Sequence, residues 1–349
     1  MPRQHKPTIA ITGLEGRDNP YPGIAVARAL RAAMGAKIRL IGLAYDPLLT
    51  GALRRDLFDA VYVTPLPSDP PAVLLHRLRE IHAQDPITGF IPTLDSEIPL
   101  WSRLQDEFAR EGWRTMLPPH AAVLARTKVA LAGFCGAHGF HTPRTEPVSH
   151  VDSFFARSDW SFPVFLKGPI ADAERVTNLD EARNAYARLS ATWGFPVLAQ
   201  EPLVGTEFDV AAVADRGQLD SAVAIRKVAL SSLGKAVAAE VVEDRAALEL
   251  AARIVRALNW HGPLELELMK SARDGVFHLI EINGRFPAWV GMTPEAGPNL
   301  PARVLERLLD TPVSRAGQAR TGTLFFRTSR TTIGSVDDLS ALQNKGSLS

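Results

Sequence analysis

Apolar runs alternate with amphipathic segments along the first third of the chain. Residues 8–12 (TIAIT) form a short apolar run, and a loop rich in Gly and Pro follows it. Gly23 then opens a segment with a helical stripe of apolar residues, which Gly35 ends, and the apolar run KIRLIGLAY comes next. A strand, a helix and a strand in this order predict a parallel sheet. The runs AVYVTPL and ITGFIPTL extend it, with a helix over LLHRLREIHAQ between them.

Polar side chains follow two of these predicted strands. In parallel sheets, ligands bind beyond the carboxyl ends of the strands. The loops at residues 13–23 and 95–97 occupy such ends, and they supply the candidate substrate contacts Asp18, Asn19, Asp95 and Glu97. An alternative for Asp18 and Asn19 is a turn before Pro20. The first loop lacks the G-x-G-x-x-G spacing, which disfavours dinucleotide binding.

The middle of the chain begins with a break at Pro118-Pro119. A helix carrying Arg126 and Lys128 is predicted after it, and the buried strand FPVFL then ends at Lys167. A lysine at the end of an apolar strand either snorkels to solvent or reaches a bound phosphate. The segment KGPIADAERV reads as a loop, and residues 178–181 resemble a capping box that starts a helix. Further strands are predicted over FPVLAQ, FDVAAVA, SAVAIRKVAL and KAVAAEVVED.

Acidic residues interrupt a predicted hairpin near residue 270. The segment 264–269 alternates acidic and apolar side chains, and 276–282 is a second apolar run. Pairing of these strands can bring Glu267 beside Glu281, while Asn283 shares a strand face with Glu281. Two carboxylates and an amide oxygen form a set of hard ligands suited to Mg²⁺. The alternative to a metal site is a strand face that is simply exposed to solvent. Arg285 follows on the same face as a cation for phosphate or carboxylate.

Composition excludes several classes of protein. A chain of 349 residues predicts two or more domains, and a net charge of +1 gives no sign of a nucleic-acid surface or a polybasic membrane anchor. The N-terminal apolar run is too short for a signal peptide, and no stretch is long enough to cross a membrane. The one cysteine, Cys135, excludes disulfides within the chain. We therefore expect a cytoplasmic protein that binds neither nucleic acid nor membrane, and a homodimer is left open.

The order of Lys128, Lys167, QEPLVGTE, LELELM and IEINGR resembles the ATP-grasp superfamily. The resemblance is to enzymes of the carboxylate–amine or carboxylate–thiol ligase type, whose nucleotide domain is like that of carbamoyl-phosphate synthase and biotin carboxylase. It implies an α/β fold, with an N-terminal Rossmann-like pre-ATP-grasp domain over residues 1–117 and an α+β ATP-grasp domain over 118–314. It further implies a lid subdomain at about 144–202 and a short C-terminal segment at 315–349.

The resemblance also implies a role for each matching residue. ATP is expected with Mg²⁺, with two ions, for which Mn²⁺ is an alternative. The nucleotide would contact Lys128, Lys167, Gln200, Glu201, Leu203 and Glu207. The metal ligands would be Glu267, Glu281 and Asn283. The catalytic groups would be Arg285, Lys167 and Arg226.

The implied reaction joins a substrate carboxylate, activated as an acyl phosphate, to an amine, with release of ADP and phosphate. The substrates would be small molecules or peptides. The alternatives are a carboxylase or carbamoyl-phosphate type of enzyme, and a nucleotide-binding regulatory module without turnover. One departure concerns the loop after Lys167, which usually holds Gly and Ser residues that close over the phosphates. Here it contains Asp172 and Glu174 instead, with Arg175 as the cation that can offset them.

Overall fold

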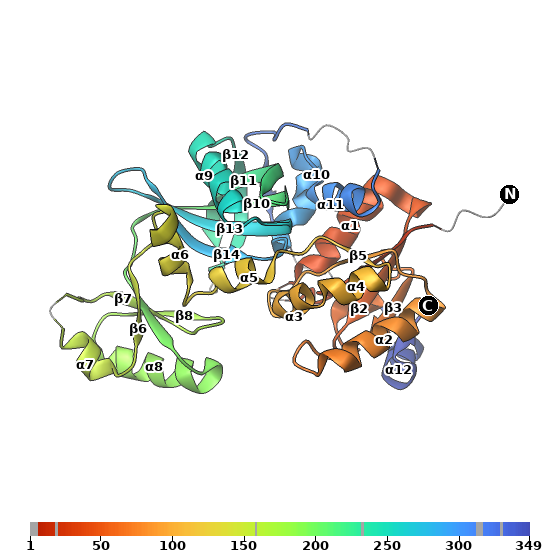
Figure 1. Cartoon of the computed structure of the whole chain (residues 1–349), viewed down its shortest axis with the longest axis horizontal. Helices are drawn as coiled ribbons and strands as arrows, with labels where there is room; N and C mark the ends of the chain where they lie inside the picture. The colour runs from red at the N-terminus through yellow and green to blue at the C-terminus, as the bar shows by residue number, and fades with distance from the viewer. Residues whose placement is uncertain (1–5, 18–19, 158, 232–233, 312–316, 329–330) are drawn as a thin grey trace. The chain divides into compact units, whose positions relative to one another are not determined.

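The computed structural model describes residues 6–17, 20–157, 159–231, 234–311, 317–328 and 331–349. The chain divides into two units. Figure 1 shows the chain coloured by residue number. The first unit contains residues 1–123, 210–265 and 283–349. The second contains residues 124–209 and 266–282. None of the described helices is long and apolar enough to span a membrane.

A six-stranded sheet in the order β16-β3-β2-β1-β4-β5 organises the N-terminal part of the first unit. Pairing is parallel from β3 through β5, as the sequence predicts for a strand-helix-strand pattern. The strands are β1 (Thr8–Ile11), β2 (Arg39–Ala44), β3 (Ala60–Val63), β4 (Gly89–Ile91), β5 (Arg114–Thr115) and β16 (Ser347–Leu348). The helices are α1 (Pro22–Met34), η1 (Gly35–Lys37), η2 (Thr50–Leu53), α2 (Pro71–Gln84), α3 (Ile98–Arg103), α4 (Gln105–Arg110) and α12 (Val336–Lys345).

Helix α1 begins where the chain leaves β1, and glycine is required at this point. A Cβ atom on Gly23 would lie 2.0 Å from the carbonyl oxygen of Thr12 and 2.5 Å from that of Gly13. The Gly23 amide also donates to the Gly13 carbonyl at 3.1 Å. The helix therefore starts in direct contact with the backbone that follows β1.

We expect Gly23→Ala to destabilise the protein by about 3 kcal/mol or more, because backbone oxygens cannot move aside as a flexible side chain can. Gly133→Ala is the matched control: this glycine lies inside a helix, and a Cβ there would meet nothing within 4 Å. The control should stabilise by about 1 kcal/mol, since alanine favours the helix. Urea denaturation monitored by circular dichroism measures both values, and equal stability of the two variants would contradict the close contact.

The C-terminal residues return to the N-terminal sheet. Strand β16 pairs antiparallel with β3, Ser347 opposite Tyr62 and Leu348 opposite Val61. Leu342 of α12 and Leu348 are both buried in the main core of the first unit. The segment predicted as a short C-terminal addition thus supplies an edge strand and a covering helix.

A second six-stranded sheet has the order β14-β13-β10-β11-β12-β15. The strands are β10 (Gly205–Asp215), β11 (Gln218–Leu230), β12 (Ala236–Val242), β13 (Gly262–Ser271), β14 (Phe277–Asn283) and β15 (Leu324–Phe326). The helices of this region are α9 (Arg245–Ala257), η3 (Ala288–Met292), α10 (Thr293–Ala296) and α11 (Leu300–Leu308). Asp244 caps α9 by accepting from the amides of Ala246 and Ala247, as the sequence predicts. The chain passes between the two units within α5 (His120–Ala125), β10, β13 and β14.

The second unit contains a four-stranded sheet in the order β6-β9-β7-β8, whose pairs are antiparallel. Its strands are β6 (Thr145–Val148), β7 (Val164–Lys167), β8 (Ala173–Val176) and β9 (Val197–Gln200). Helices α7 (Val151–Phe155) and α8 (Leu179–Trp193) lie along it in Figure 1 and share its apolar core. Helix α8 starts with the predicted capping box, in which Asn178 accepts from the amide of Glu181.

Two local expectations need correction in this region. The helix predicted to carry Arg126 and Lys128 is interrupted, because α5 (His120–Ala125) ends before them and α6 (Leu131–His138) starts after them. The segment after Lys167 is not a long loop, since Ala173–Val176 forms β8 and pairs with β7. The four residues AERV do not alternate apolar and polar side chains, so the sequence contains no signal for this strand.

Candidate active site

Two lysines and two carboxylates gather in the second unit. Lys167 is the last residue of β7, and Lys128 lies in the turn between α5 and α6. Burial lowers the pKa of Lys167, and the nearby charge of Lys128 lowers it further. Glu281 and Glu267 act in the opposite direction and raise it. The structure therefore brings together four residues that the sequence placed in one nucleotide and metal site.

This cluster combines the charges that a metal–polyphosphate needs. The two ammonium groups can neutralise phosphate oxygens, while the two carboxylates are hard ligands for a divalent cation. A partly buried lysine with a lowered pKa is held at a free-energy cost, which an incoming anion can offset. Such perturbed groups gather at functional sites more often than elsewhere.

Asn283 follows Glu281 by two residues on β14, so the two side chains leave the same face of the strand. Asn283 is buried, and its Nδ2 donates to Glu265 Oε2 at 3.1 Å. Its amide nitrogen is thereby oriented, which directs Oδ1 away from Glu265. The described residues contain no group of three or more His, Cys, Asp or Glu side chains arranged for a metal. The proposed ligand set is of another kind, with two carboxylates and one amide.

Arg285 is held by two acids of the first unit. Its Nε lies 2.8 Å from Asp95 Oδ2 and its Nη1 lies 2.5 Å from Glu265 Oε2. Asp95 Oδ1 also accepts from the amide of Gly284 at 3.0 Å. Asp95, expected as a substrate contact, thus orients the guanidinium of Arg285.

Glu265 is a polar site residue that our sequence interpretation missed. It is buried, and it accepts from both Asn283 and Arg285. The signal was available, because Glu265 precedes Glu267 by two residues in LELELM and so shares its strand face. The alternation that identified Glu267 therefore applied equally to its neighbour.

Glu97 occupies a different environment from the one expected. Its side chain is 0% exposed, and it accepts from the hydroxyls of Thr12 and Tyr45 and from the amides of Thr93 and Leu94. Burial raises its pKa, while these hydrogen bonds act to lower it. Direct contact with a substrate does not fit this burial, and the carboxylate instead ties the ends of β1, β2 and β4 together.

The loop of residues 13–23 is partly described. Asp18 and Asn19, both expected as substrate contacts, lie outside the described residues. Before them, Glu15 accepts from the guanidinium of Arg17 and from the amides of Gly16 and Arg17. Burial acts to raise the pKa of Glu15, but these hydrogen bonds outweigh it and lower the pKa to about 2.

The expected adenine contacts lie where β9 ends. Gln200 is buried, and its Nε2 donates to Thr145 Oγ1 at 3.0 Å. The Glu201 amide donates to the Arg144 carbonyl at 3.0 Å, and the Glu201 side chain accepts from the Arg144 amide at 2.8 Å. Leu203 follows in the connection to β10, whose third residue is Glu207. The four residues are thus close along one chain segment, as their spacing predicts.

The sequence profile of one family matches residues 195–328. Its description is "ATP-grasp in the biosynthetic pathway with Ter operon". The match includes the β9 end, the acidic hairpin and Arg285. This part of the chain therefore matches an ATP-grasp family model. No curated protein sequence matches the chain.

Solved structures with the same ATP-grasp fold come from enzymes of several activities. L-amino acid ligase from Bacillus licheniformis has a TM-score of 0.64 at 16% identity, over 87% of this chain and 74% of that one. N5-carboxyaminoimidazole synthetase from Staphylococcus aureus has a TM-score of 0.69 at 12% identity, over 97% and 85%. The biotin carboxylase domain of Hydrogenobacter thermophilus 2-oxoglutarate carboxylase, solved as a dimer with MgADP and bicarbonate, has a TM-score of 0.69 at 12% identity, over 90% and 73%. At these low identities, the TM-scores show a common fold and nothing further about this chain.

The segment after Lys167, expected to close over the phosphates, forms a short hairpin whose two acids both have partners. Trp193 Nε1 donates to Asp172 Oδ2 at 2.8 Å, and Arg188 pairs with Glu174 at 2.5 Å. Because these partners neutralise or occupy the acids, the hairpin repels phosphate less than its sequence suggests. Arg175 on β8 is exposed.

Arg226, expected as a catalytic group, lies on β11 and pairs with Glu240 of β12 at 2.5 Å. The two residues are directly opposite in the antiparallel register. Cross-strand pairs of opposite charge are a common feature of sheets. The pairing gives Arg226 a structural partner, and its catalytic role stays a prediction.

Proposed function

We propose that this ATP-grasp protein is an ATP-dependent ligase. It activates a substrate carboxylate as an acyl phosphate, and an amine then attacks the acyl carbon to form an amide, with release of ADP and phosphate. The observation that supports this most is the cluster in the second unit in which the charges of Lys128, Glu267 and Glu281 all act on Lys167. The fold it shares with L-amino acid ligase is consistent with the proposal.

The cationic side chains bind and stabilise the phosphate groups. Lys128 and Lys167 hold the β- and γ-phosphates and compensate the charge that spreads over the γ-phosphoryl group during transfer. A carboxylate oxygen of the substrate attacks the γ-phosphorus, and the bond to the β-phosphate oxygen breaks. Arg285, oriented by Asp95 and Glu265, stabilises the developing acyl phosphate.

The nucleotide base and the metal are held by separate groups. Gln200, Glu201 and Leu203 bind the adenine through side-chain and backbone groups, and Glu207 binds the ribose hydroxyls. Glu267, Glu281 and Asn283 are the residues that would hold Mg²⁺, and their oxygen donors fit this hard cation. When bound, Mg²⁺ supplies positive charge that neutralises the phosphate oxygens. The amine attacks the acyl phosphate directly, so the reaction needs no nucleophilic side chain. This agrees with the state of Cys135, whose thiol is buried and has its pKa raised by that burial to about 11.

A phosphate-release screen tests the proposal. The protein is incubated with MgATP and pairs of carboxylic acids and amines, including free amino acids and dipeptides. We expect release that needs both members of one pair, with one amide and one ADP formed per phosphate, as checked by mass spectrometry. ADP formation with no dependence on any acid or amine would contradict a ligase.

A carboxylase is the second candidate, because the N5-carboxyaminoimidazole synthetase and biotin carboxylase structures share the fold. Bicarbonate in place of the organic acid distinguishes the two. If bicarbonate alone satisfies the acid requirement, and labelled carbon enters the amine, the protein is a carboxylase. A regulatory module would bind ATP and release no phosphate under any of these conditions.

A further inference from the structure

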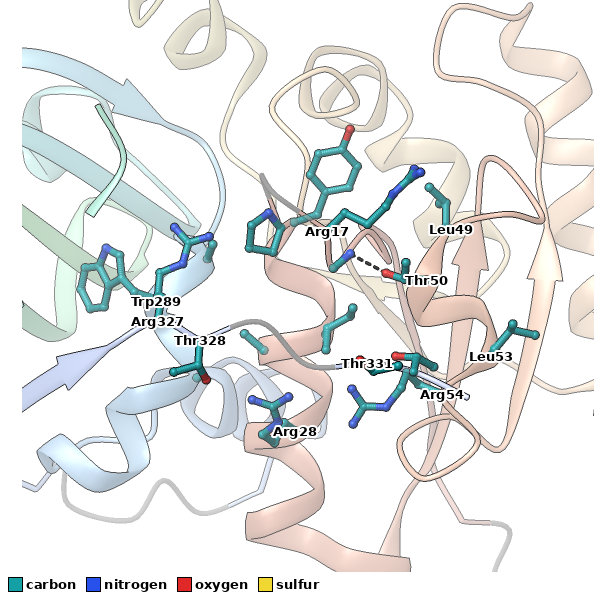
Figure 2. A pocket seen from close by; sticks show the side chains of 18 of the residues that line it. Arg17, Arg28, Leu49, Thr50, Leu53, Arg54, Trp289, Arg327, Thr328 and Thr331 are labelled. Carbon is teal, nitrogen blue, oxygen red and sulfur yellow. Dashed lines mark hydrogen bonds between the residues drawn. The ribbon is translucent and has the colours of Figure 1, made fainter. Parts of the chain in front are cut away.

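A cavity of about 710 Å³ lies in the first unit (Figure 2). Its described lining comes from the loop before α1, from α1 itself, from the segment after β2, from η3, and from β15 and the residues that follow it. Small-molecule sites in proteins commonly have volumes of roughly 300–1,000 Å³. The cavity is therefore large enough for a substrate.

The charged side chains among the described lining residues are all positive. The described lining includes four arginines and no Asp or Glu: Arg17, Arg28, Arg54 and Arg327. Two of them have acidic partners that are not part of the lining, since Glu15 pairs with Arg17 and Asp56 pairs with Arg54. Hydroxyl groups from four threonines add donors: Thr50, Thr328, Thr331 and Thr332. Guanidinium and hydroxyl groups are the side chains that bind phosphate and carboxylate oxygens.

Arg327 has the most distinctive environment of the four. It is partly buried, and its Nη1 donates to the carbonyl of Ala236 at 3.3 Å. Among the described residues, no carboxylate pairs with it. Burial lowers the pKa of its guanidinium. A cation that is partly desolvated and lacks an anionic partner is costly to keep, so an anion entering the cavity would offset this cost.

An aromatic wall adjoins these cations. Trp289 and Phe325 stack with their rings 6.3 Å apart and 19° from parallel, and both line the cavity. Figure 2 shows Trp289, Arg327 and Thr328 on one side of the cavity, and Arg17, Thr50 and Arg54 on the other. Ile24 and Leu53 add further apolar surface. The lining thus offers an apolar surface next to positive charge.

We infer that this cavity binds a small molecule in which a dianionic oxyanion group, a phosphomonoester or a dicarboxylate, adjoins a flat apolar part. The charge selects the anion, and the aromatic wall selects the flat part. Resting on the proposed function, the inference makes this molecule one of the two substrates of the ligase. The sequence is consistent with this, because the lining resumes at Ala288, three residues after Arg285.

Calorimetric titration without ATP tests the binding. The probes are phenyl phosphate and phthalate, which are flat dianions, and benzyl alcohol, which is flat and neutral. We expect saturable binding of at least one dianion, weakened by added salt, and none of benzyl alcohol. The tighter of the two dianions tells whether the group is a phosphate or a pair of carboxylates. If neither dianion binds, or if benzyl alcohol binds equally well, the inference is wrong.

Two variants place the binding in this cavity. Arg327→Gln and Arg28→Gln should each weaken the dianion by roughly tenfold or more, the usual loss of a charge-assisted hydrogen bond. Arg79→Gln is the control, since Arg79 is an exposed residue of α2 outside the lining. Thermal unfolding checks that each variant folds, and Arg28→Gln carries the test alone if Arg327→Gln does not, because Arg28 is exposed. Unchanged affinity in the folded variants would place the dianion elsewhere.

The titration and the phosphate-release screen, run on the same protein, distinguish failure of this inference from failure of the proposed function. Dianion binding without any phosphate release in the substrate screen would contradict the ligase and leave the cavity assignment standing. Acid- and amine-dependent phosphate release, without dianion binding to the cavity, would support the ligase and overturn the inference.

Discussion

Glu281→Gln should nearly abolish turnover while the protein stays folded. The substitution keeps the size of the side chain but removes a negative charge from the group proposed to hold Mg²⁺. Loss of a residue that only supports a metal ligand typically costs roughly 10- to 100-fold in activity or metal affinity. We expect the loss of a ligand itself to exceed this range. Steady-state phosphate release with saturating ATP, measured across a range of Mg²⁺ concentrations, gives the value.

The control for this experiment is Glu249→Gln on α9, where the carboxylate is largely exposed and pairs with Arg245 four residues earlier. An exposed pair of this kind contributes little to stability. The control should therefore retain wild-type turnover and an unchanged melting temperature. If Glu281→Gln retained most of its activity, the metal assignment would be wrong, whatever the control did.

Lys167→Met should weaken ATP binding without lowering the stability of the unliganded protein. The substitution removes a charge-assisted phosphate contact, so we expect ATP affinity to fall by roughly 10- to 100-fold. Isothermal titration with MgATP measures this. The exposed residue Lys37 supplies the matched control, since Lys37→Met changes the same charge outside the cluster. ATP affinity equal to that of the wild type would leave Lys167 a residue that only terminates β7.

The same variant should be at least as stable as the wild type at pH 7 without ligand. Burial, followed by the charge of Lys128, lowers the pKa of Lys167 below its ordinary value. A lysine with a lowered pKa in the folded state destabilises that state fully below the folded pKa. The destabilisation fades as the pH rises toward the unfolded pKa. Urea denaturation at pH 7 and at pH 10 should show a gain for Lys167→Met at the lower pH, and the gain should shrink at the higher pH.

Much of this fold could be predicted from the sequence, because its signals are local. The parallel N-terminal sheet follows from apolar runs separated by the helical stripe between Gly23 and Gly35, and the structure confirms it. The strand-end position of Lys167 left its role open, and the resemblance to ATP-grasp enzymes is what assigned it to the phosphates. Strand alternation in the hairpin identified Glu267 and Glu281, but the charge interactions of both with Lys167 join strands of two different sheets.

The features that could not be predicted depend on partners distant in the chain. Glu97 looked like a loop acid, since nothing near it in sequence shows that Thr12 and Tyr45 would donate to it. Asp95 likewise acquires its role from Arg285, almost two hundred residues later. The arginine-lined cavity is assembled from segments near both ends of the chain, so no local pattern marks it.

The pairing of β16 with β3 also bears on how the protein is made. Strand β3 leaves the ribosome well before Ser347 and Leu348, the residues that pair with it. Until they arrive, the backbone groups along this side of β3 have no strand to pair with, and an open strand of this kind invites pairing with other chains. Completion of the N-terminal sheet therefore waits for residues 347 and 348, and this edge of β3 stays open to other chains until they are made.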